Sequence, residues 1–519
     1  MSPISHSELT KNAGVVAFFT TLSRFAGLIR DMVTAHLFGA NAVMDAFNIA
    51  FTIPNTLRRF VAEGALTVAF IPVYTEVLRT DGLEEAKKFY RSVLGLLLIT
   101  LTLLVLVGIL GASYWVYAFA SGFAKHAGQL ELATSLTRWM FVYVFFISFV
   151  ALAMGALNSH KHFSTPAFSP VLLNVSMVGC SIYFYTAFQQ PIYSLALGVI
   201  LGGILQLAAQ LPTLARYGLL LKPSFQFHSK PLEKLLRMLL PSVFGVAIYQ
   251  INLMVLRQLG SYLPEGQITC YSTADRIMQL ALGIFAISIA TATLPAMSEQ
   301  SQDHAKLLQT WNFSTRLTNF ITIPASIGLT TIGLPIVSVL FFHGAYDWQA
   351  TELTAWATIA FAPGLITVAF CRTTVQAFYA LQDMRTPVLV ATVVLLVNFA
   401  LGVLLMPYEV VGLAGSLTLS SFIQAFLLAF FLKRKIGLLG GRVLIRSMLQ
   451  QMILSAFMGA IAYGICSWGS WQEGPTLKNS AILGLALTSS IGFYAAATLF
   501  SRMEEASLIQ AIFLKKLKK

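Results

Sequence analysis

Long apolar stretches separated by short polar segments recur along the whole chain. A helix of about 20 apolar residues is long enough to cross the hydrocarbon core of a membrane. Fourteen such stretches can be counted, at residues 12–37, 45–78, 89–120, 131–158, 166–188, 191–217, 231–260, 269–298, 311–341, 353–380, 386–406, 410–435, 443–467 and 479–501. The pattern therefore predicts an all-α polytopic membrane protein with about 14 transmembrane helices, and the even number places both termini on one side.

Three short motifs occur twice, at offsets of 219 to 223 residues. "FIPVYTE" and "TLPAMSE" end the second and eighth stretches, "STPAFSPVLLN" and "RTPVLVATVVLLVN" open the fifth and eleventh, and "YGLL" and "IGLL" close the sixth and twelfth. This order predicts two six-helix lobes, at 1–220 and 221–440, followed by two additional helices and a basic tail at 441–519. Transporters built from such repeats bind their substrate between the two halves.

Lysine and arginine are distributed unequally between the loops on the two sides. Most lie in the two tails, or in or beside the loops that join an even-numbered stretch to the next odd-numbered one. The opposite loops are nearly bare, with Lys125, Arg138, Arg257 and Lys478 in or beside them. Because cytoplasmic loops carry the excess of basic residues, both termini are predicted to be cytoplasmic.

The composition excludes most other classes of protein. Of 519 residues, 57% are hydrophobic and 11% charged, with a mean hydropathy of +0.75, whereas a soluble domain carries about 25% charged residues. The net charge of +13 is explained by cytoplasmic loops that face anionic lipid, so no nucleic-acid partner is expected. The four cysteines form no metal-binding or disulfide pattern, and no catalytic motif occurs. We therefore expect neither an enzyme nor a cofactor nor a metal site.

Several arginines fall inside the apolar stretches, where each costs about 2.5 to 3.5 kcal/mol at a helix centre. If these arginines faced lipid, the free-energy cost of inserting the helices into the membrane would be prohibitive. We therefore expect them to face a hydrated interior. They are Arg24, Arg30, Arg58, Arg59, Arg276 and Arg372.

Some of these charges are predicted to serve structure by forming ion pairs. Arg59 precedes Glu63 by one helical turn, and Asp31 follows Arg30 directly, so both acids are expected to be structural partners. Arg372 stands alone in the tenth stretch, and either a structural or a substrate-binding role is open for it.

Four arginines remain, and the stretches around them contain few spare carboxylates. A cavity with excess positive charge favours an anion, and the planar fork of arginine suits phosphate. The four are Arg24, Arg30, Arg58 and Arg276.

The segments "SRFAGLIRD", "DAFNIAFTIPNTLRRFVAEGALTVAFIPVYTE" and "ADRIMQ" resemble the MurJ (MviN) lipid II flippases, within the multidrug/oligosaccharidyl-lipid/polysaccharide exporter superfamily. The resemblance implies fourteen helices, two six-helix lobes with a cationic central cavity, and two C-terminal helices bordering a groove for the polyprenyl tail. It implies Arg24, Arg30, Arg58, Arg276 and Asp45 as functional residues. The implied location is the bacterial cytoplasmic (inner) membrane, and the implied partners are lipid II, membrane lipids and cell-wall synthesis proteins.

One feature departs from the family. Some relatives bind sodium through residues of the second lobe that include acids. Here residues 237–258 and 386–406 contain no Asp or Glu, and Glu233 and Asp383 lie just outside them. We therefore expect no sodium site of that type.

The predicted function is to flip lipid II, a peptidoglycan precursor needed for cell shape, from the cytoplasmic to the outer leaflet by alternating access. The cationic cavity would bind the pyrophosphate head group. Three alternatives stay open: a flippase for another polyprenyl-linked glycan, a drug/cation antiporter of the same superfamily, and a membrane scaffold that does not transport. An antiporter should prefer acidic cavity residues, and binding of a cationic dye would favour it.

Overall fold

The computed structural model describes residues 6–60, 69–437, 440–507 and 510, and it describes the side chains of these residues except at 6–13, 240–249 and 284–292. None of the described residues lies in a β-strand, so the predicted all-α class is confirmed. Packing divides the chain into two compact units, residues 1–266 and 267–519. Each unit is described by itself.

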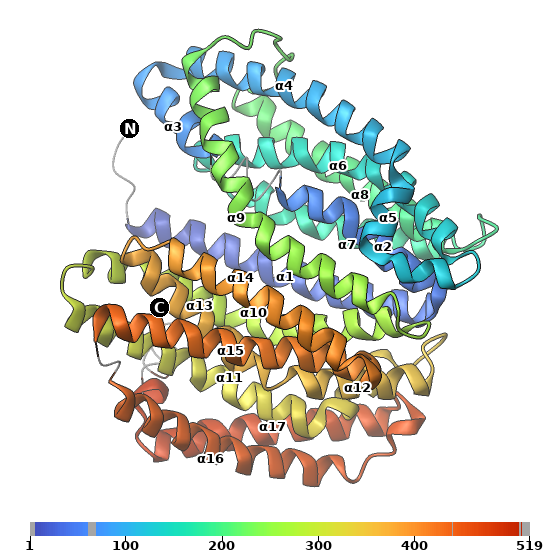
Figure 1. Cartoon of the computed structure of the whole chain (residues 1–519), viewed down its shortest axis with the longest axis vertical. Helices are drawn as coiled ribbons and strands as arrows, with labels where there is room; N and C mark the ends of the chain where they lie inside the picture. Colours follow the sequence, from blue (N-terminus) through green and yellow to red (C-terminus); the bar gives the residue numbers. More distant parts are fainter. Residues whose placement is uncertain (1–5, 61–68, 438–439, 508–509, 511–519) are drawn as a thin grey trace. The chain divides into compact units, whose positions relative to one another are not determined.

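The first unit contains nine α-helices and one 3-10 helix among its described residues (Figure 1). Helices α7 and α8 pack along each other, and α6 packs against both α2 and α8. The elements are α1 (His6–Phe38), α2 (Ala42–Arg58), α3 (Ile71–Thr80), α4 (Gly82–Leu110), α5 (Ala112–Ala120), η2 (Ser121–Lys125), α6 (Gln129–Ser159), α7 (Ser164–Tyr183), α8 (Ile192–Arg216) and α9 (Lys230–Gly260).

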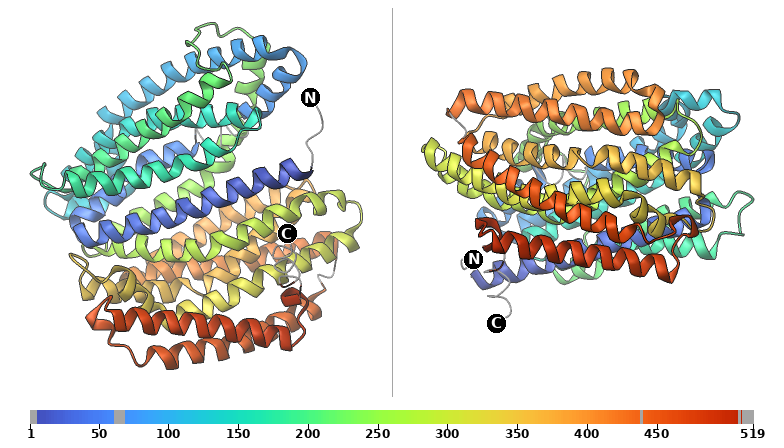
Figure 2. Two further views of the ribbon diagram at one scale, coloured as in Figure 1. Left: turned by 180° about the vertical axis from the view of Figure 1, so that it is seen from behind. Right: turned by 90° about the horizontal axis from the view of Figure 1, so that it is seen from below.

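The second unit contains eight α-helices and two 3-10 helices within the residues described. Helix α11 packs against α16, and α16 and α17 lie side by side in Figures 1 and 2. The elements are α10 (Gln267–Glu299), α11 (His304–Phe341), α12 (Trp348–Phe361), α13 (Gly364–Ala380), α14 (Arg385–Leu404), η3 (Met406–Tyr408), α15 (Glu409–Ile436), α16 (Gly441–Cys466), η4 (Trp471–Glu473) and α17 (Leu477–Phe500).

Nine helices of the described part are long and apolar enough to cross a membrane, or up to ten if a bent pair counts as one span. The pair is α12 with α13, which meet at an angle of 43°. Helices suit this environment because lipid offers no hydrogen bonds, so the backbone must satisfy its own polar groups. This set is consistent with fourteen spans, and the exact number stays a prediction.

Helix α9 packs with the first unit, although the internal repeat assigns it to the second lobe. Its Leu232 and Leu235 are buried in a hydrophobic cluster with Phe70, which directly precedes α3, and Phe89 of α4. Apolar burial of this kind is the main stabilising term in packing. The compact unit therefore extends to Gly266, while the lobe boundaries at residues 220 and 440 stay a prediction.

The linker between α8 and α9 is bound to the surface of α4. Arg91 Nε donates to the Lys222 carbonyl at 3.0 Å, and Ser224 N–H donates to the Arg91 carbonyl at 2.8 Å. A Cβ atom added at Gly95 would lie 2.0 Å from the Ser224 carbonyl oxygen. Only glycine allows this close crossing.

The segment after α17 folds back onto α11 and α16 of the second unit. Arg316 of α11 pairs with Glu504 through Nη2 at 2.5 Å and with Glu505 through Nε at 3.4 Å. Ser447 of α16 donates to Glu505 at 3.0 Å. The Glu505 side chain is 3% exposed, whereas that of Glu504 is 71% exposed.

Residues matched by the repeat adopt similar structures in the two units. The Thr-Pro pairs at 165–166 and 386–387 lie in the first turns of α7 and α14, two helices of 20 residues each. Gly218 and Gly437 follow the ends of α8 and α15 with φ of +65° and +88°, a common way to end a helix. These correspondences support the predicted duplication.

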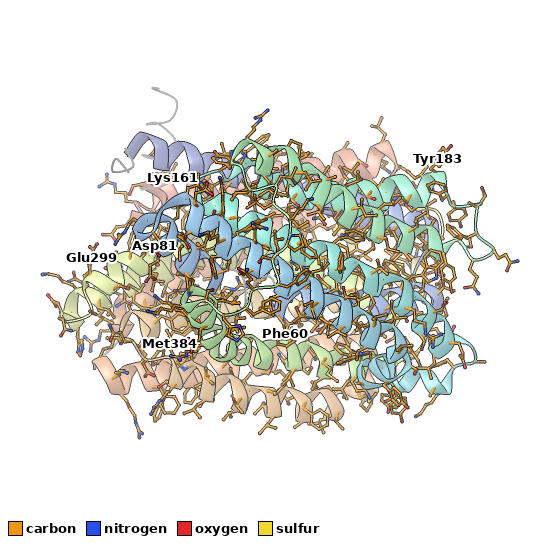
Figure 3. The ribbon with its side chains drawn as sticks, turned by 90° about the horizontal axis from the view of Figure 1, so that it is seen from above. Phe60, Asp81, Lys161, Tyr183, Glu299 and Met384 are labelled. Carbon is orange, nitrogen blue, oxygen red and sulfur yellow. The ribbon has the colours of Figure 1, made fainter. Side chains whose placement is uncertain are left out.

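Successive loops lie at opposite ends of the helix bundle, as expected when each span crosses the membrane in the direction opposite to the span before it (Figure 3). Within the first unit, Asp81 and Lys161 lie at one end of the bundle and Tyr183 lies at the opposite end. Within the second unit, Glu299 and Met384 share one end. These labelled residues therefore follow the predicted alternation of loops inside each unit.

Candidate functional site

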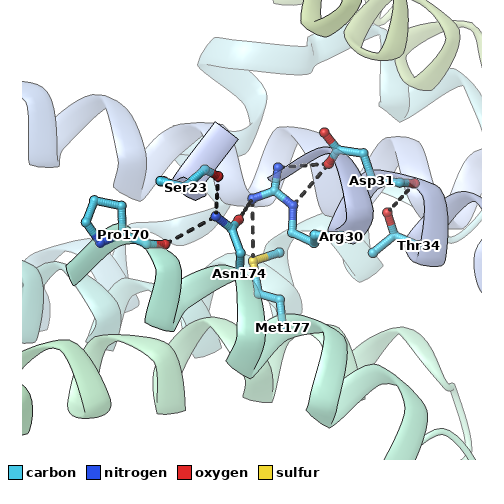
Figure 4. A network of polar contacts seen from close by, with 7 residues as sticks. All are labelled: Ser23, Arg30, Asp31, Thr34, Pro170, Asn174 and Met177. Atoms are coloured by element: carbon cyan, nitrogen blue, oxygen red, sulfur yellow. Dashed lines mark hydrogen bonds and ion pairs between the residues drawn. The ribbon is translucent and has the colours of Figure 1, made fainter. Parts of the chain in front are cut away.

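Two of the predicted site residues form an ion pair in the C-terminal half of α1. Arg30 is 6% exposed, and its Nε and Nη2 donate to Asp31 Oδ1 at 3.0 and 2.8 Å (Figure 4). The Thr34 hydroxyl donates to the Asp31 carbonyl one turn later. The Arg30 charge is thus compensated by the residue beside it, as buried charges require.

Helix α7 supplies the remaining partners of this guanidinium. Asn174 Oδ1 accepts from Arg30 Nη1 at 2.9 Å, and the Met177 sulfur lies 3.9 Å from the same nitrogen. The Asn174 amide nitrogen donates to the carbonyls of Ser23 and Pro170 (Figure 4). Asn174 therefore joins α1 to α7 and fixes one face of the Arg30 guanidinium.

Asp45 lies in the first turn of α2 and is 2% exposed. Asn41 caps this helix, because its side chain accepts from the backbone N–H groups of Val43 and Met44. The Asp45 carboxylate accepts from the Gly266 N–H at 2.7 Å. A buried carboxylate at a helix N-terminus is stabilised by the helix dipole as well as by this bond.

Arg58 stands at the other end of α2 and is half-buried. Its Nε donates to Asn55 Oδ1 at 2.8 Å, three residues earlier on the same helix. Arg58, like Arg30, therefore binds an uncharged side-chain amide.

The other predicted residues are more dispersed. Arg24 of α1 and Arg59 at the end of α2 are half-buried, and both take part in further interactions. Glu63, the predicted partner of Arg59, lies outside the described residues. In the second unit, Arg276 is half-buried in α10 and also has an interaction partner. Arg372 is half-buried in α13 and makes no hydrogen bond or ion pair with the residues described.

Sequence reasoning missed the contributions of Asn55 and Asn174. The spacing of Asn55 and Arg58, three residues apart on one helix, could have indicated that pair. Asn174 gave no such signal, because its partner Arg30 is remote in sequence. Where side chains are described, no group of three His, Cys, Asp or Glu residues could hold a metal ion.

Comparison with known proteins identifies the family. A family model described as "Lipid II flippase MurJ" matches residues 34–482. The chain belongs to the MurJ family. Among curated MurJ relatives, the probable lipid II flippase of Vibrio cholerae is 34% identical over 500 residues, covering 92% of this chain and 94% of the relative. The lipid II flippase of Burkholderia cenocepacia is 35% identical over 435 residues, covering 82% and 83%.

Solved structures agree with this assignment. A lipid II flippase MurJ in an inward closed conformation is 25% identical, with a TM-score of 0.79 and coverage of 94% of this chain and 98% of that one. An inward-facing multidrug transporter of the MATE family matches at 15% identity, with a TM-score of 0.66 and coverage of 83% and 99%. The second match shows a shared fold alone. The chain is thus a lipid II flippase of the MurJ family, a multi-pass protein of the bacterial inner membrane that serves peptidoglycan biosynthesis.

Proposed function

We propose that the pyrophosphate of lipid II is bound by Arg24, Arg30 and Arg58 of the first unit together with Arg276 of the second. Each guanidinium presents a planar set of N–H donors that matches phosphate oxygens, and such charge-assisted bonds are about twice as strong as neutral ones. The observation that carries this proposal is that Arg30 and Arg58, both in helices of the first unit, bind uncharged amide oxygens, those of Asn174 and Asn55.

The partners of Arg30 suggest how it engages an anion. Asp31 offsets its charge while the site is empty, and Asn174 supplies an uncharged acceptor to Nη1. An anionic phosphate oxygen is a stronger acceptor than an amide oxygen. We therefore expect the head group to take the place of Asn174 on Arg30, while Asp31 keeps the guanidinium plane fixed.

Asp45 and the secondary residues receive other roles. A carboxylate repels a pyrophosphate, and the Asp45 carboxylate already accepts from the Gly266 N–H, so we assign it to positioning the loop before α10. Arg59 acts as a structural charge. Arg372 is a secondary contact for the sugar or phosphate part of the head group.

Transport would proceed by alternating access, with the polyprenyl tail remaining in lipid beside α16 and α17. The positive-inside distribution supports cytoplasmic termini and loading from the inner leaflet. Cell-wall synthesis proteins would receive the lipid II on the outer side.

The test is replacement of Arg24 or Arg276 by alanine in a strain depleted of its own flippase. We expect loss of complementation and about 10- to 100-fold weaker lipid II binding by native mass spectrometry, because each lost bond to a charged group is worth about 1.5 to 3 kcal/mol. Arg138→Ala on the exposed surface of α6 is the control and should behave as wild type. Full complementation by both R24A and R276A would refute the assignment.

A further inference from the structure

Helices α7 and α8 of the first unit are in close backbone contact around two glycines of α8. The Ser176 hydroxyl donates to the Gly198 carbonyl at 2.9 Å. A Cβ atom added at Gly198 would lie 2.7 Å from the Met177 Cα atom, and one added at Gly202 would lie 3.1 Å from the Leu173 Cα atom. The two backbones approach this closely because glycine has no side chain.

Further along α8, glutamines follow these glycines on the face that packs against α7. Gln206 Nε2 donates to the Ser169 carbonyl at 3.1 Å, and Gln210 Nε2 donates to the Thr165 carbonyl at 3.5 Å. Positions 198, 202, 206 and 210 are four apart, so they lie along one face of α8. Here long polar side chains join the two helices.

Three polar groups at this junction have no hydrogen-bond partner among the residues that the structure describes. They are the Oε1 atoms of Gln206 and Gln210 and the hydroxyl oxygen of Ser169. The three residues are 3%, 0% and 1% exposed, so bulk solvent does not reach them. The glutamine orientations are fixed, because only the nitrogen of the amide can donate to a carbonyl. A buried polar group without a partner is costly, and this cost indicates a ligand.

The three groups require one ligand that both donates and accepts. The two amide oxygens need donors, and the Ser169 hydroxyl proton needs an acceptor. One water molecule meets these needs, and buried waters make about three hydrogen bonds. With bonds of about 2.8 Å, it spans groups up to about 5.5 Å apart, which is the rise of the one helical turn between Gln206 and Gln210. A sodium ion fits less well, because neither α7 nor α8 contains an Asp or Glu to offset its charge.

We propose that a water molecule is bound between α7 and α8 by Gln206, Gln210 and Ser169, as an integral part of this interface. The polar contacts continue from the site to the end of the bundle, because the Thr165 hydroxyl is hydrogen-bonded at 2.9 Å to His162 of the loop before α7. Water enters the interface from this end.

The water site lies beside one of the candidate functional residues. Ser169 directly precedes Pro170, whose carbonyl accepts from the Asn174 amide nitrogen at 3.2 Å, and Asn174 in turn binds Arg30. The water therefore stabilises the segment of α7 that carries a partner of Arg30. The inference does not depend on what Arg30 binds during transport, because all groups of the water site belong to α7 and α8.

The test is a density map of the whole protein in nanodiscs, at a resolution that shows ordered water. We expect one peak about 2.8 Å from the Ser169 hydroxyl and from both glutamine Oε1 atoms, with sodium in the buffer or with choline in its place. Ser181→Ala is the control: Ser181 is also buried in α7, but its hydroxyl donates to the Val178 carbonyl, so the peak should remain. Absence of the peak in the wild type, or its loss when choline replaces sodium, would overturn the proposal.

Replacement of Ser169 gives a second test that needs no map. Asn and Leu have the same branched shape, but the amide of Ser169→Asn can take the place of the water and donate to both glutamine oxygens. Ser169→Leu leaves these oxygens unpaired. We expect S169N to melt about 4 °C above S169L, because unpaired buried groups destabilise the fold. Equal melting temperatures, or a lower one for S169N, would contradict a bound water at this position.

Discussion

Arg30 and Arg316 are both placed inside helices and both pair with acids, but their partners come from different distances along the chain. Arg30 is compensated by its neighbour Asp31, and Asn174 of α7 adds a neutral acceptor. Arg316 depends on Glu504 and Glu505, which lie 188 and 189 residues later. A charge compensated by its own helix moves with that helix, whereas one compensated from afar holds separate elements together.

This difference agrees with the two roles. The Arg30 site keeps its charge balance if α1 and α7 shift, which suits the substrate-binding role proposed for Arg30. The ion pairs of Arg316 hold the C-terminal segment against α11 and α16. If this segment moved away, the Arg316 charge would lose its acidic partners. Removing one partner of a buried ion pair strongly destabilises the folded protein, because the other charge stays buried without compensation.

The largest effect should follow the replacement Glu505→Ala. It removes the buried acceptor shared by Arg316 and Ser447, and we expect a loss of about 3 kcal/mol, seen as a lower melting temperature in detergent. Glu504→Ala is the matched control, because that side chain is 71% exposed and surface pairs are worth about 0 to 1 kcal/mol. Equal losses of stability in the two variants would contradict the conclusion that the buried Glu505, and not the exposed Glu504, holds the C-terminal segment in place.

A smaller effect is expected for Asn174→Ala, since Arg30 keeps Asp31. The unsatisfied Nη1 group should cost about 1 to 3 kcal/mol of stability. Asn174→Asp retains an acceptor for Arg30 but loses the amide donor to the Ser23 and Pro170 carbonyls, so it should also melt below wild type, and it should bind lipid II more weakly because a second carboxylate opposes the anion. Native mass spectrometry and thermal melting together check both outcomes. Wild-type melting and wild-type lipid II binding in N174A would contradict the role of Asn174 as a partner of Arg30.

The smallest effect should come from Asp383, whose side chain is 14% exposed and whose partner Lys435 is 40% exposed. Burial of its carboxylate disfavours the charged form, but hydrogen bonds from Lys435 and Thr386 outweigh this and lower its pKa to about 2. The ionised form is therefore stabilised by folding, and its contribution is complete above the unfolded pKa of about 4 and is lost as pH falls towards 2.

Asp383→Asn should consequently reduce stability at pH 7 by less than about 1 kcal/mol, because Lys435 is partly exposed and solvent screens the pair. The melting temperatures of D383N and wild type should converge as pH falls from 4 to 2. A difference that persists at pH 2 would show that the ion pair is not its cause.

The helical membrane fold and the family could be predicted from the sequence. They depend on the length of the apolar stretches and on short motifs, and both are read from consecutive residues. The neighbour relation of Arg30 and Asp31 is visible in the same way. Asn174 and Glu505 could not be assigned, since their partners are 144 and 189 residues away and only packing brings them together. The roles of Arg24, Arg30, Arg58 and Arg276 as phosphate ligands stay predictions.

The placement of α9 shows a second limit of the sequence. The internal repeat indicates a duplication of the sequence, and it assigns α9 to the second half. Packing follows buried apolar surface instead, and Leu232 and Leu235 complete the core of the first unit. The predicted stretch 45–78 likewise contains two described helices, α2 and α3, because hydropathy does not mark the end of a helix.

The linker bound across α4 at Gly95 affects how halves of related flippases can be recombined. A hybrid gene joined near residue 220 would lay a foreign linker over Gly95 and separate α9 from the cluster that buries it. A junction after Gly266 would keep both sets of contacts within one parent. Hybrids spliced there should therefore reach the membrane in higher yield than those spliced at the boundary of the repeats.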